Sequence, residues 1–183
     1  MKYNLLLKRL VFYGLFLLIF TNASAQGVER WDIKTLKDSS YTNVLLNDPI
    51  ESTVKDLNLI PRPLNIKNFT PRLQEECYVF IVNCKVLDYI KQDDGDYHLI
   101  VCDLDNPEFK MIVEVIMPKY GNSLYYNKFK TVRDYLTSKI RARKLKGYNF
   151  KITGVAFFDL IHNQKEKSIN CIELHPVLNI KSL

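Results

Sequence analysis

The order of the hydrophobic patterns after residue 75 is the feature that most limits what this chain can fold into. Five segments are rich in β-branched and aromatic residues, which is typical of strands. The Asp94-Gly95 pair between the first two is a strong hairpin signal, and one longer segment has apolar residues at helical spacing. The sequence therefore predicts strands at 76–90, 97–103, 110–117, 148–160 and 171–180, and a helix from a Ser123 cap to about Lys144, with Phe129, Val132, Leu136 and Ile140 on one stripe and Gly147 as terminator.

Three strands, a helix and two more strands follow the order of the OB-fold, a small five-stranded barrel. We therefore expect a mainly β protein with one helix, its five-stranded OB-like barrel formed by residues 75–183. Residues 26–74 are punctuated by prolines, and we expect them to form a partly irregular strap over the barrel. Within it, Asp48 and Pro49 are predicted to begin a short helix. The other architecture that these elements allow is an open α+β roll.

The first 25 residues have the pattern of a signal peptide. Lys2, Lys8 and Arg9 form a basic start, residues 10–20 are apolar apart from one glycine, and Ala23-Ser24-Ala25 gives the small residues that signal peptidase needs. The apolar stretch is shorter than the roughly 20 residues of a membrane-spanning helix. We therefore expect cleavage before Gln26, a secreted or periplasmic protein, and no stable membrane insertion after cleavage, with a retained anchor as the alternative.

The charge of the chain is concentrated in its helix. The formal net charge is +6 at pH 7, and the three basic residues before residue 26 reduce it to +3 for the remaining chain. Residues 122–147 hold eight basic side chains beside the single acid Asp134. The sequence predicts an anionic partner at the basic helix Lys128–Lys146, with a solvated lysine-rich face as the alternative. The acidic turn at 93–96 would repel phosphates at the rim where OB-folds bind nucleic acids.

Alternation along the strands predicts which side chains face the barrel interior. Residues of opposite parity should face outward, where Ile100, Ile112 and Ile116 need cover and the strap is available to supply it. The predicted inner set is Tyr97, Leu99 and Val101, then Met111, Val113 and Val115, then Ile172, Leu174, Pro176 and Leu178.

Histidines and acidic residues occur close together at several outward positions. A register centred on the turn at 105–107 places His98 opposite Glu114, and the OB order brings the last strand beside the third. Carboxylates with imidazoles are what a divalent metal ion or a general acid–base pair requires. The metal candidates are His98, Glu114, Glu173 and His175, and the wider ligand-binding candidates are Asp94, Asp96, His98, Glu114, Asp159 and His162.

Two functions are compatible with these residues. One is a non-catalytic OB-like binding or interaction domain, in which each polar group is separately hydrogen-bonded, for instance to the strap. The other is a metal-dependent hydrolase, such as a phosphodiesterase or nuclease, in which the acidic and histidine side chains converge in an open cleft. The residues available to such a hydrolase are Asp96, His98, Glu114, Glu173 and His175.

Export would permit disulfides among Cys77, Cys84, Cys102 and Cys171. Four cysteines allow three complete pairings, and the sequence does not choose among them. The chain has no C-x-x-C spacing, which disfavours zinc-ribbon and thioredoxin-type sites.

Four segments of the chain carry a resemblance when they are taken together. They are residues 29–36 (ERWDIKTL), 94–99 (DGDYHL), 154–159 (GVAFFD) and 172–178 (IELHPVL). The combination resembles a family of often exported bacterial proteins of uncharacterised activity, over nearly the whole chain after residue 25. The resemblance implies export but no particular reaction. This chain departs from the family near Asn163 and Cys171, where small residues are expected.

The strand, Asp-Gly-Asp, strand arrangement also resembles the thermonuclease family, whose OB-type barrel binds calcium and cleaves phosphodiesters. This likeness covers only Gly95 and the aspartates beside it. Where that family has an arginine in the third strand, this chain has Glu114 or its neighbours, and no Asp-Thr-Pro-Glu segment follows Met117-Pro118. The phosphate-binding groups of a nuclease are therefore missing, and a fold alone does not imply a function.

Overall fold

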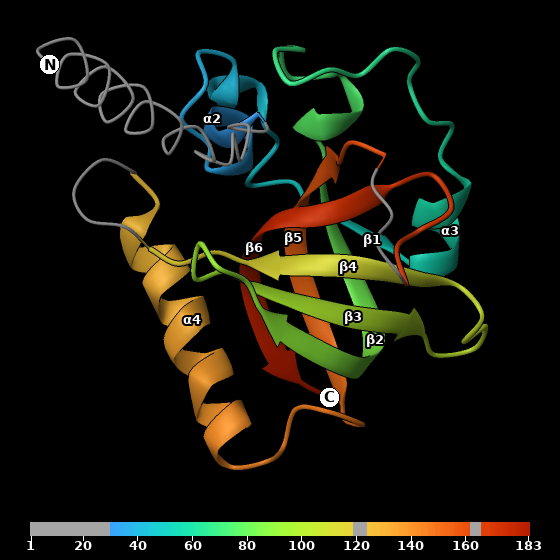
Figure 1. Ribbon diagram of the computed structural model, residues 1–183, viewed down its shortest axis with the longest axis vertical. Helices are drawn as coiled ribbons and strands as arrows, with labels where there is room; N and C mark the ends of the chain where they lie inside the picture. The colour runs from blue at the N-terminus through green and yellow to red at the C-terminus, as the bar shows by residue number, and fades with distance from the viewer. Residues whose placement is uncertain (1–29, 119–123, 162–165) are drawn as a thin grey trace, which may run out of the picture.

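The computed structural model describes residues 30–118, 124–161 and 166–183 and shows a β-barrel with a helix along one side and a strap across one end (Figure 1). The predicted signal peptide lies outside the described residues. The elements in chain order are α2 (Trp31–Lys34), a 3-10 helix (Tyr41–Asn43), β1 (Ile50–Ser52), α3 (Val54–Leu59), a second 3-10 helix (Glu75–Cys77), β2 (Val79–Lys91), β3 (Tyr97–Asp103), β4 (Lys110–Val115), α4 (Tyr126–Arg141), β5 (Asn149–Phe158) and β6 (Ile172–Ser182).

Five strands close into the barrel. The sheet order is β1-β2-β3-β4-β6-β5, and β5 returns to pair with β2. The β4–β6 pair is parallel, whereas the other pairs within the barrel are antiparallel. This closed, mainly β architecture confirms the expected OB-like barrel, with its helix between the third and fourth barrel strands.

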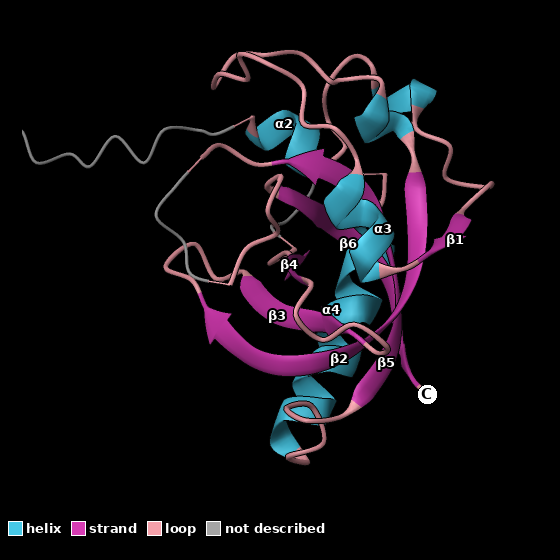
Figure 2. Cartoon of the chain, turned by 90° about the vertical axis from the view of Figure 1, so that its right-hand side faces the viewer, coloured by secondary structure: helices cyan, strands magenta, loops and turns pink. Residues whose placement is uncertain are grey.

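The strap adds one short strand that the sequence pattern did not predict. Ile50–Ser52 pairs in parallel with β2 outside the closed barrel (Figure 2). The helix expected to start at Asp48 and Pro49 begins instead at Val54. Thr53 is its N-cap and accepts a hydrogen bond from the Asp56 N–H at 2.9 Å.

The starts and ends of two elements, β2 and α4, differ from the predicted ones. The first barrel strand starts at Val79, because residues 75–77 form a 3-10 turn. Helix α4 begins at Tyr126, after Tyr125 rather than Ser123, which lies outside the described residues. It ends at Arg141, before the predicted end, because Arg143 adopts a left-handed φ of 56°. Gly147 lies beyond this end and donates a hydrogen bond to the Val86 carbonyl at 2.7 Å.

The barrel interior is filled by the predicted alternation on β3 and β4, whereas β6 departs from it after Leu174. Leu99, Val101, Met111, Val113, Val115, Ile172 and Leu174 all lie in the main core, together with Val132 and Leu136 of α4. Leu178 does not, because the β5–β6 register shifts between Gly154 and Ala156 and changes which side chains face inward. Val177 takes the interior position, and Leu178 joins a second cluster.

That second cluster shows what the strap covers. Leu36 and Val44 of the strap pack with Ile116, Phe129 and Leu178 outside the main core. The strap therefore buries an outward isoleucine, as the alternation predicted. No helix within the described ranges is long and apolar enough to cross a membrane. All four cysteines lie within the described ranges and have free thiols.

Candidate metal centre

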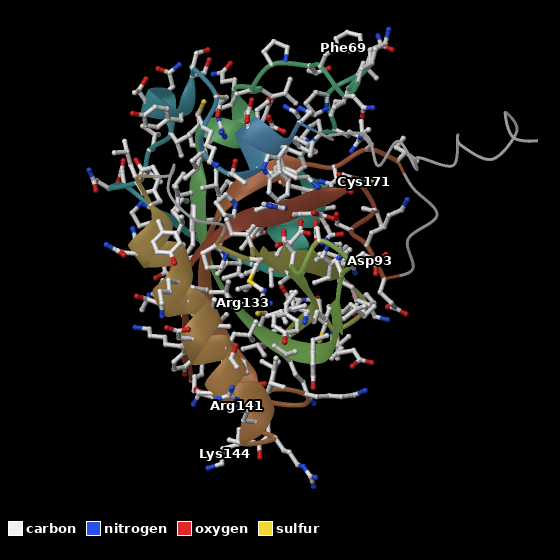
Figure 3. The ribbon with its side chains drawn as sticks, turned by 60° about the vertical axis from the view of Figure 1, so that its left-hand side comes forward. Phe69, Asp93, Arg133, Arg141, Lys144 and Cys171 are labelled. Atoms are coloured by element: carbon white, nitrogen blue, oxygen red, sulfur yellow. The ribbon has the colours of Figure 1, made fainter. Side chains whose placement is uncertain are left out.

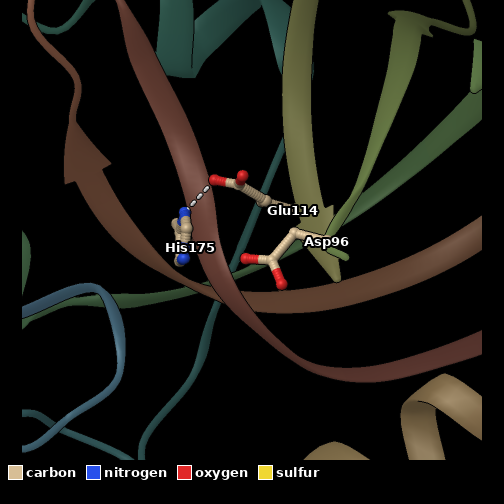
Figure 4. Close-up of side chains that lie close together, drawn as sticks. All are labelled: Asp96, Glu114 and His175. Carbon is tan, nitrogen blue, oxygen red and sulfur yellow. Dashed lines mark ion pairs between the residues drawn. The ribbon is translucent and has the colours of Figure 1, made fainter. Parts of the chain in front are cut away.

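Three strands of the barrel bring an acid, a second acid and a histidine to one place. Asp96 immediately precedes β3, Glu114 lies on β4, and His175 lies on β6 (Figure 4). The β3–β4 register pairs His98 with Glu114, as predicted, so that Asp96 and Glu114 share the outward face. The parallel β4–β6 pairing then places the outward residues of β6 beside them.

The three side chains form a compact set of possible ligands. One ligand atom from each of Asp96, Glu114 and His175 lies within 4.8 Å of the other two. Glu114 is the centre of the arrangement: its Oε1 contacts His98 Nε2 and its Oε2 contacts His175 Nδ1. The exposed fractions of Asp96, Glu114 and His175 are 0%, 3% and 1%. The set is therefore formed and desolvated in the folded chain.

Two buried polar atoms of this set have neither a hydrogen bond nor an ion-pair contact among the described residues. Asp96 Oδ1 accepts the Met117 N–H at 2.5 Å, but Oδ2 has no hydrogen-bond partner. His175 Nδ1 contacts Glu114, but Nε2 has no hydrogen-bond partner. A buried polar atom without a partner costs about 1–3 kcal/mol, and in native proteins such an atom often marks the place where an ion binds.

The surroundings shift the pKa values of three buried carboxyl groups in different directions. Burial raises the pKa of Asp96 to about 6, although the hydrogen bond from Met117 opposes the shift. Burial also raises the pKa of Glu173, well above its ordinary value, and nearby Asp159 and Glu114 add to this effect. Burial acts in the same direction on Glu114, but the charge of His175 and hydrogen bonds from both histidines outweigh it, so its pKa is well below the ordinary range.

His98 responds to the same carboxylate. Burial lowers its pKa, but the hydrogen bond and the charge of Glu114 act more strongly in the opposite direction, so the net shift is upward. The cationic form of His98 is therefore favoured beside an ionised Glu114. His98 orients the carboxylate from outside the three-residue set.

Lys34 of the strap lies over the other side of Glu114. Its Nζ is 4.0 Å from Glu114 Oε2 and 3.5 Å from Asp159 Oδ1. The same ammonium lies 5.1 Å from the centre of the Phe157 ring, which is in turn 5.7 Å from the His175 ring. The strap therefore supplies a positive charge beside the buried carboxylates of Glu114 and Asp159.

Arg30 anchors the strap beside this lysine. Its guanidinium binds both oxygens of Glu76, at 2.7 and 2.5 Å, and donates to the carbonyls of Thr70, Pro71 and Phe158. Glu76 in turn accepts the Phe158 N–H at 3.0 Å. This buried pair fixes the end of β5 and the start of α2, and so determines where Lys34 lies.

The structure brings most of the sequence-predicted residues into one region. Asp96, Glu114 and His175 form the compact set, with His98 beside Glu114. Buried Glu173 and Asp159 lie within electrostatic reach of Glu114 and Lys34. Asp94 is exposed in the β2–β3 turn and accepts the Asp96 N–H at 2.9 Å. His162 lies outside the described residues.

Sequence reasoning missed three residues of this region: Lys34, Arg30 and Glu76. The one available signal was local, since Arg30 and Lys34 both belong to the 29–36 segment that carries the family resemblance. Their partners are many residues away along the chain, and no periodicity connects them.

Comparisons with models of protein families, with curated proteins and with solved structures find no match to this chain. The resemblance to a family of exported bacterial proteins stays a prediction. Assignment of a function therefore depends on the chemistry of the residues described above.

Proposed function

We propose that this protein is an exported, non-catalytic binding domain that holds one divalent transition-metal ion with Asp96, Glu114 and His175. The observation that carries the proposal is the convergence of these three buried side chains. Two of them present an atom with neither a hydrogen bond nor an ion-pair contact among the described residues. Export is proposed from the basic, apolar and small-residue pattern of residues 1–25.

The donor set suits such an ion. Two carboxylates and one imidazole are common ligands of Zn²⁺, and Mn²⁺ also accepts them. Ligand atoms about 2.1 Å from one Zn²⁺ lie roughly 3.4 Å apart at a tetrahedral angle. Because the three atoms already lie within 4.8 Å of one another, side-chain movements of the order of 1 Å complete the site.

The charge of the region supports the same conclusion. Asp96, Glu114, Asp159 and Glu173 bring four buried carboxyl groups near the single ammonium of Lys34. Buried charges are costly unless they are paired, protonated or bound to a metal. Without an ion, a proton on Glu173 and, below about pH 6, a proton on Asp96 reduce the negative charge. A divalent cation would replace the proton on Asp96.

Burial is why we propose binding rather than hydrolysis. A catalytic metal keeps an open coordination position that substrate can reach, whereas none of the three residues is more than 3% exposed. The alternative, a metal-dependent hydrolase, requires that the covering residues open. It predicts metal-dependent cleavage of a simple diester such as bis-(4-nitrophenyl) phosphate.

The proposal is tested by isothermal titration calorimetry of EDTA-treated protein with Zn²⁺ and with Mn²⁺. We expect one ion per chain, and at least about tenfold weaker binding in His175→Gln, which keeps a polar side chain but removes the imidazole. Asp93→Asn is the matched control, because Asp93 is an exposed carboxylate in the same turn as Asp96. Absence of binding, or equal binding by the His175 variant, would overturn the proposal.

A further inference from the structure

A second site lies between α4 and the outer wall of the barrel. It is a groove of about 780 Å³, bounded by α4 on one side, by Leu46 and Pro49 of the strap on another, and by β2, β5 and β6 below. Pockets of about 300–1,000 Å³ are the usual size for small-molecule ligands. No residue of the metal centre lines it, so this site is independent of the proposed function.

The floor of the groove combines apolar and polar side chains. Ile81 of β2, Val132 of α4, and Leu178 and Ile180 of β6 line it. The three-strand row from Ile81 through Thr153 to Asn179 crosses its base, because these residues are paired in the β2–β5 and β5–β6 registers. Val132, Leu178 and Ile180 are already buried in the cores. A hydrocarbon chain placed along the groove would remove from water the apolar surface of the half-buried lining residues Leu46, Ile81 and Tyr135, together with its own.

The charge of the groove has one sign. Lys128 is the single ionised side chain among its lining residues in the described ranges, which include no Asp or Glu. Lys128 is exposed and lies in the first turn of α4, where no acidic residue occurs. An anionic group is therefore favoured at this end of the groove and meets no repelling carboxylate there.

The other cations of α4 do not extend this site into a continuous basic face. Lys130 pairs with Asp134 at 2.5 Å. Lys139 does not line the groove, although its Nζ lies 4.9 Å from the ring centre of Tyr135, which does. Arg133 is buried against the barrel, donates to the carbonyls of Val115 and Gly95, and lies 3.9 Å from the Tyr97 ring centre. Arg141 is near the far end of the helix (Figure 3), about 20 Å from Lys128 at the helical rise of 1.5 Å per residue.

We propose that this groove binds a small amphipathic anion, with its apolar chain on the Ile81–Ile180 floor and its carboxylate or similar acidic group at Lys128. The sequence predicted an anionic partner at the basic helix. This proposal specifies that partner as one acidic amphiphile at the N-terminal half of α4, rather than a polymer along the whole helix. A single lining cation beside apolar side chains matches a monomeric fatty-acid-like molecule, whereas a polyanion needs several free cations in a row.

The test measures binding of dodecanoate to the full chain, by displacement of 1-anilinonaphthalene-8-sulfonate and by titration calorimetry. We expect one dodecanoate per chain and at least about tenfold weaker binding in Lys128→Glu. Lys130→Glu is the matched control, because that lysine lies two residues away on the same helix and does not line the groove. Its affinity should change by less than about twofold.

A second variant tests the apolar floor without changing charge. Thr131→Trp places a large side chain at an exposed lining position and should block dodecanoate while the thermal midpoint stays near that of the wild type. Dodecanol, which has no charge, should bind more weakly to the wild type and equally to wild type and Lys128→Glu.

Several outcomes would overturn the proposal. The first is absence of dodecanoate binding. The second is an equal loss of dodecanoate affinity in Lys128→Glu and Lys130→Glu. The others are unchanged affinity in the folded Thr131→Trp variant, and a protein that binds anionic vesicles but not dodecanoate. Dimerisation that Thr131→Trp abolishes, without any dodecanoate binding, would assign the groove to a second copy of the chain.

Discussion

His98 and Glu114 face each other across the β3–β4 pair, and the imidazole Nε2 of one contacts the carboxylate Oε1 of the other. The second oxygen of Glu114 contacts His175 on β6. One buried carboxylate therefore links three neighbouring strands of the barrel. Its loss would affect both the proposed metal site and the stability of the fold.

Glu114→Ala should strongly destabilise the metal-free protein. The substitution leaves two histidines without their shared partner in a desolvated place, and breaking a buried ion pair costs about 3–5 kcal/mol. Urea unfolding at pH 7 measures the loss. Glu108→Ala, at an exposed glutamate in the β3–β4 turn, should change the free energy of unfolding by less than about 0.5 kcal/mol. Similar losses in the two variants would contradict the central role of Glu114.

Asp96 should make the stability of the metal-free protein depend on pH. Its pKa is raised from 3.8 to about 6 in the folded chain, so the folded state binds the proton more tightly, and this contribution to stability is lost as pH rises from about 4 to 6. Asp96→Asn mimics the protonated form. The free energy of unfolding of the variant, taken relative to that of the wild type, should be roughly 3 kcal/mol higher at pH 8 than at pH 4. Urea titrations at the two pH values test this difference, and a pH-independent difference would contradict it.

The same group should link metal uptake to proton release. A ligand carboxylate must be ionised, so an ion that binds at pH 5 displaces the proton of Asp96. Calorimetry in two buffers of different ionisation enthalpy should show more proton release at pH 5 than at pH 7. Equal proton release at both values would exclude Asp96 from the ligand set.

Lys34→Gln should tighten metal binding while it destabilises the metal-free protein. The ammonium lies 4.0 Å from Glu114 Oε2 and repels any cation bound there, so its removal should increase affinity at least about tenfold. In the absence of metal, Glu114 and Asp159 lose a positive neighbour. Lys37→Gln, three residues along the strap and exposed, is the control. Unchanged affinity in the Lys34 variant would show that the ammonium does not act on the site.

Arg30→Met should release the strap. The substitution leaves Glu76 buried without its bidentate partner and should cost about 3–5 kcal/mol. Hydrogen exchange should increase in residues 30–46 before it does in the barrel strands. The double variant with Glu76→Met should recover much of the loss, because replacement of both charges by apolar groups is often nearly neutral. Additive losses would indicate that the two residues act separately.

The parts of the site that follow from local pattern could be predicted from the sequence. Period-two alternation and the turn at 105–107 determine that His98 faces Glu114, and the OB order determines that β6 lies beside β4. The predicted β3 range, 97–103, matches the observed strand for the same reason.

The remaining parts depend on contacts between distant segments. Asp96 turns toward the cluster because its carboxylate receives the Met117 N–H, a bond across 21 residues. Lys34 and Arg30 come from the strap, whose path over the barrel has no periodic signature. Val177, rather than the predicted Leu178, faces the interior because the β5–β6 register shifts. Alternation along the sequence cannot anticipate such a shift.

The position of β6 after the other barrel strands has a consequence for how the site forms. His175 lies on the barrel strand that is synthesised after the other four, and this strand pairs with both β4 and β5 (Figure 1). A nascent chain that has exposed only β2 to β5 therefore has neither the closed barrel nor the third ligand. Any ion bound by Asp96, Glu114 and His175 together is acquired only after β6 has docked between β4 and β5.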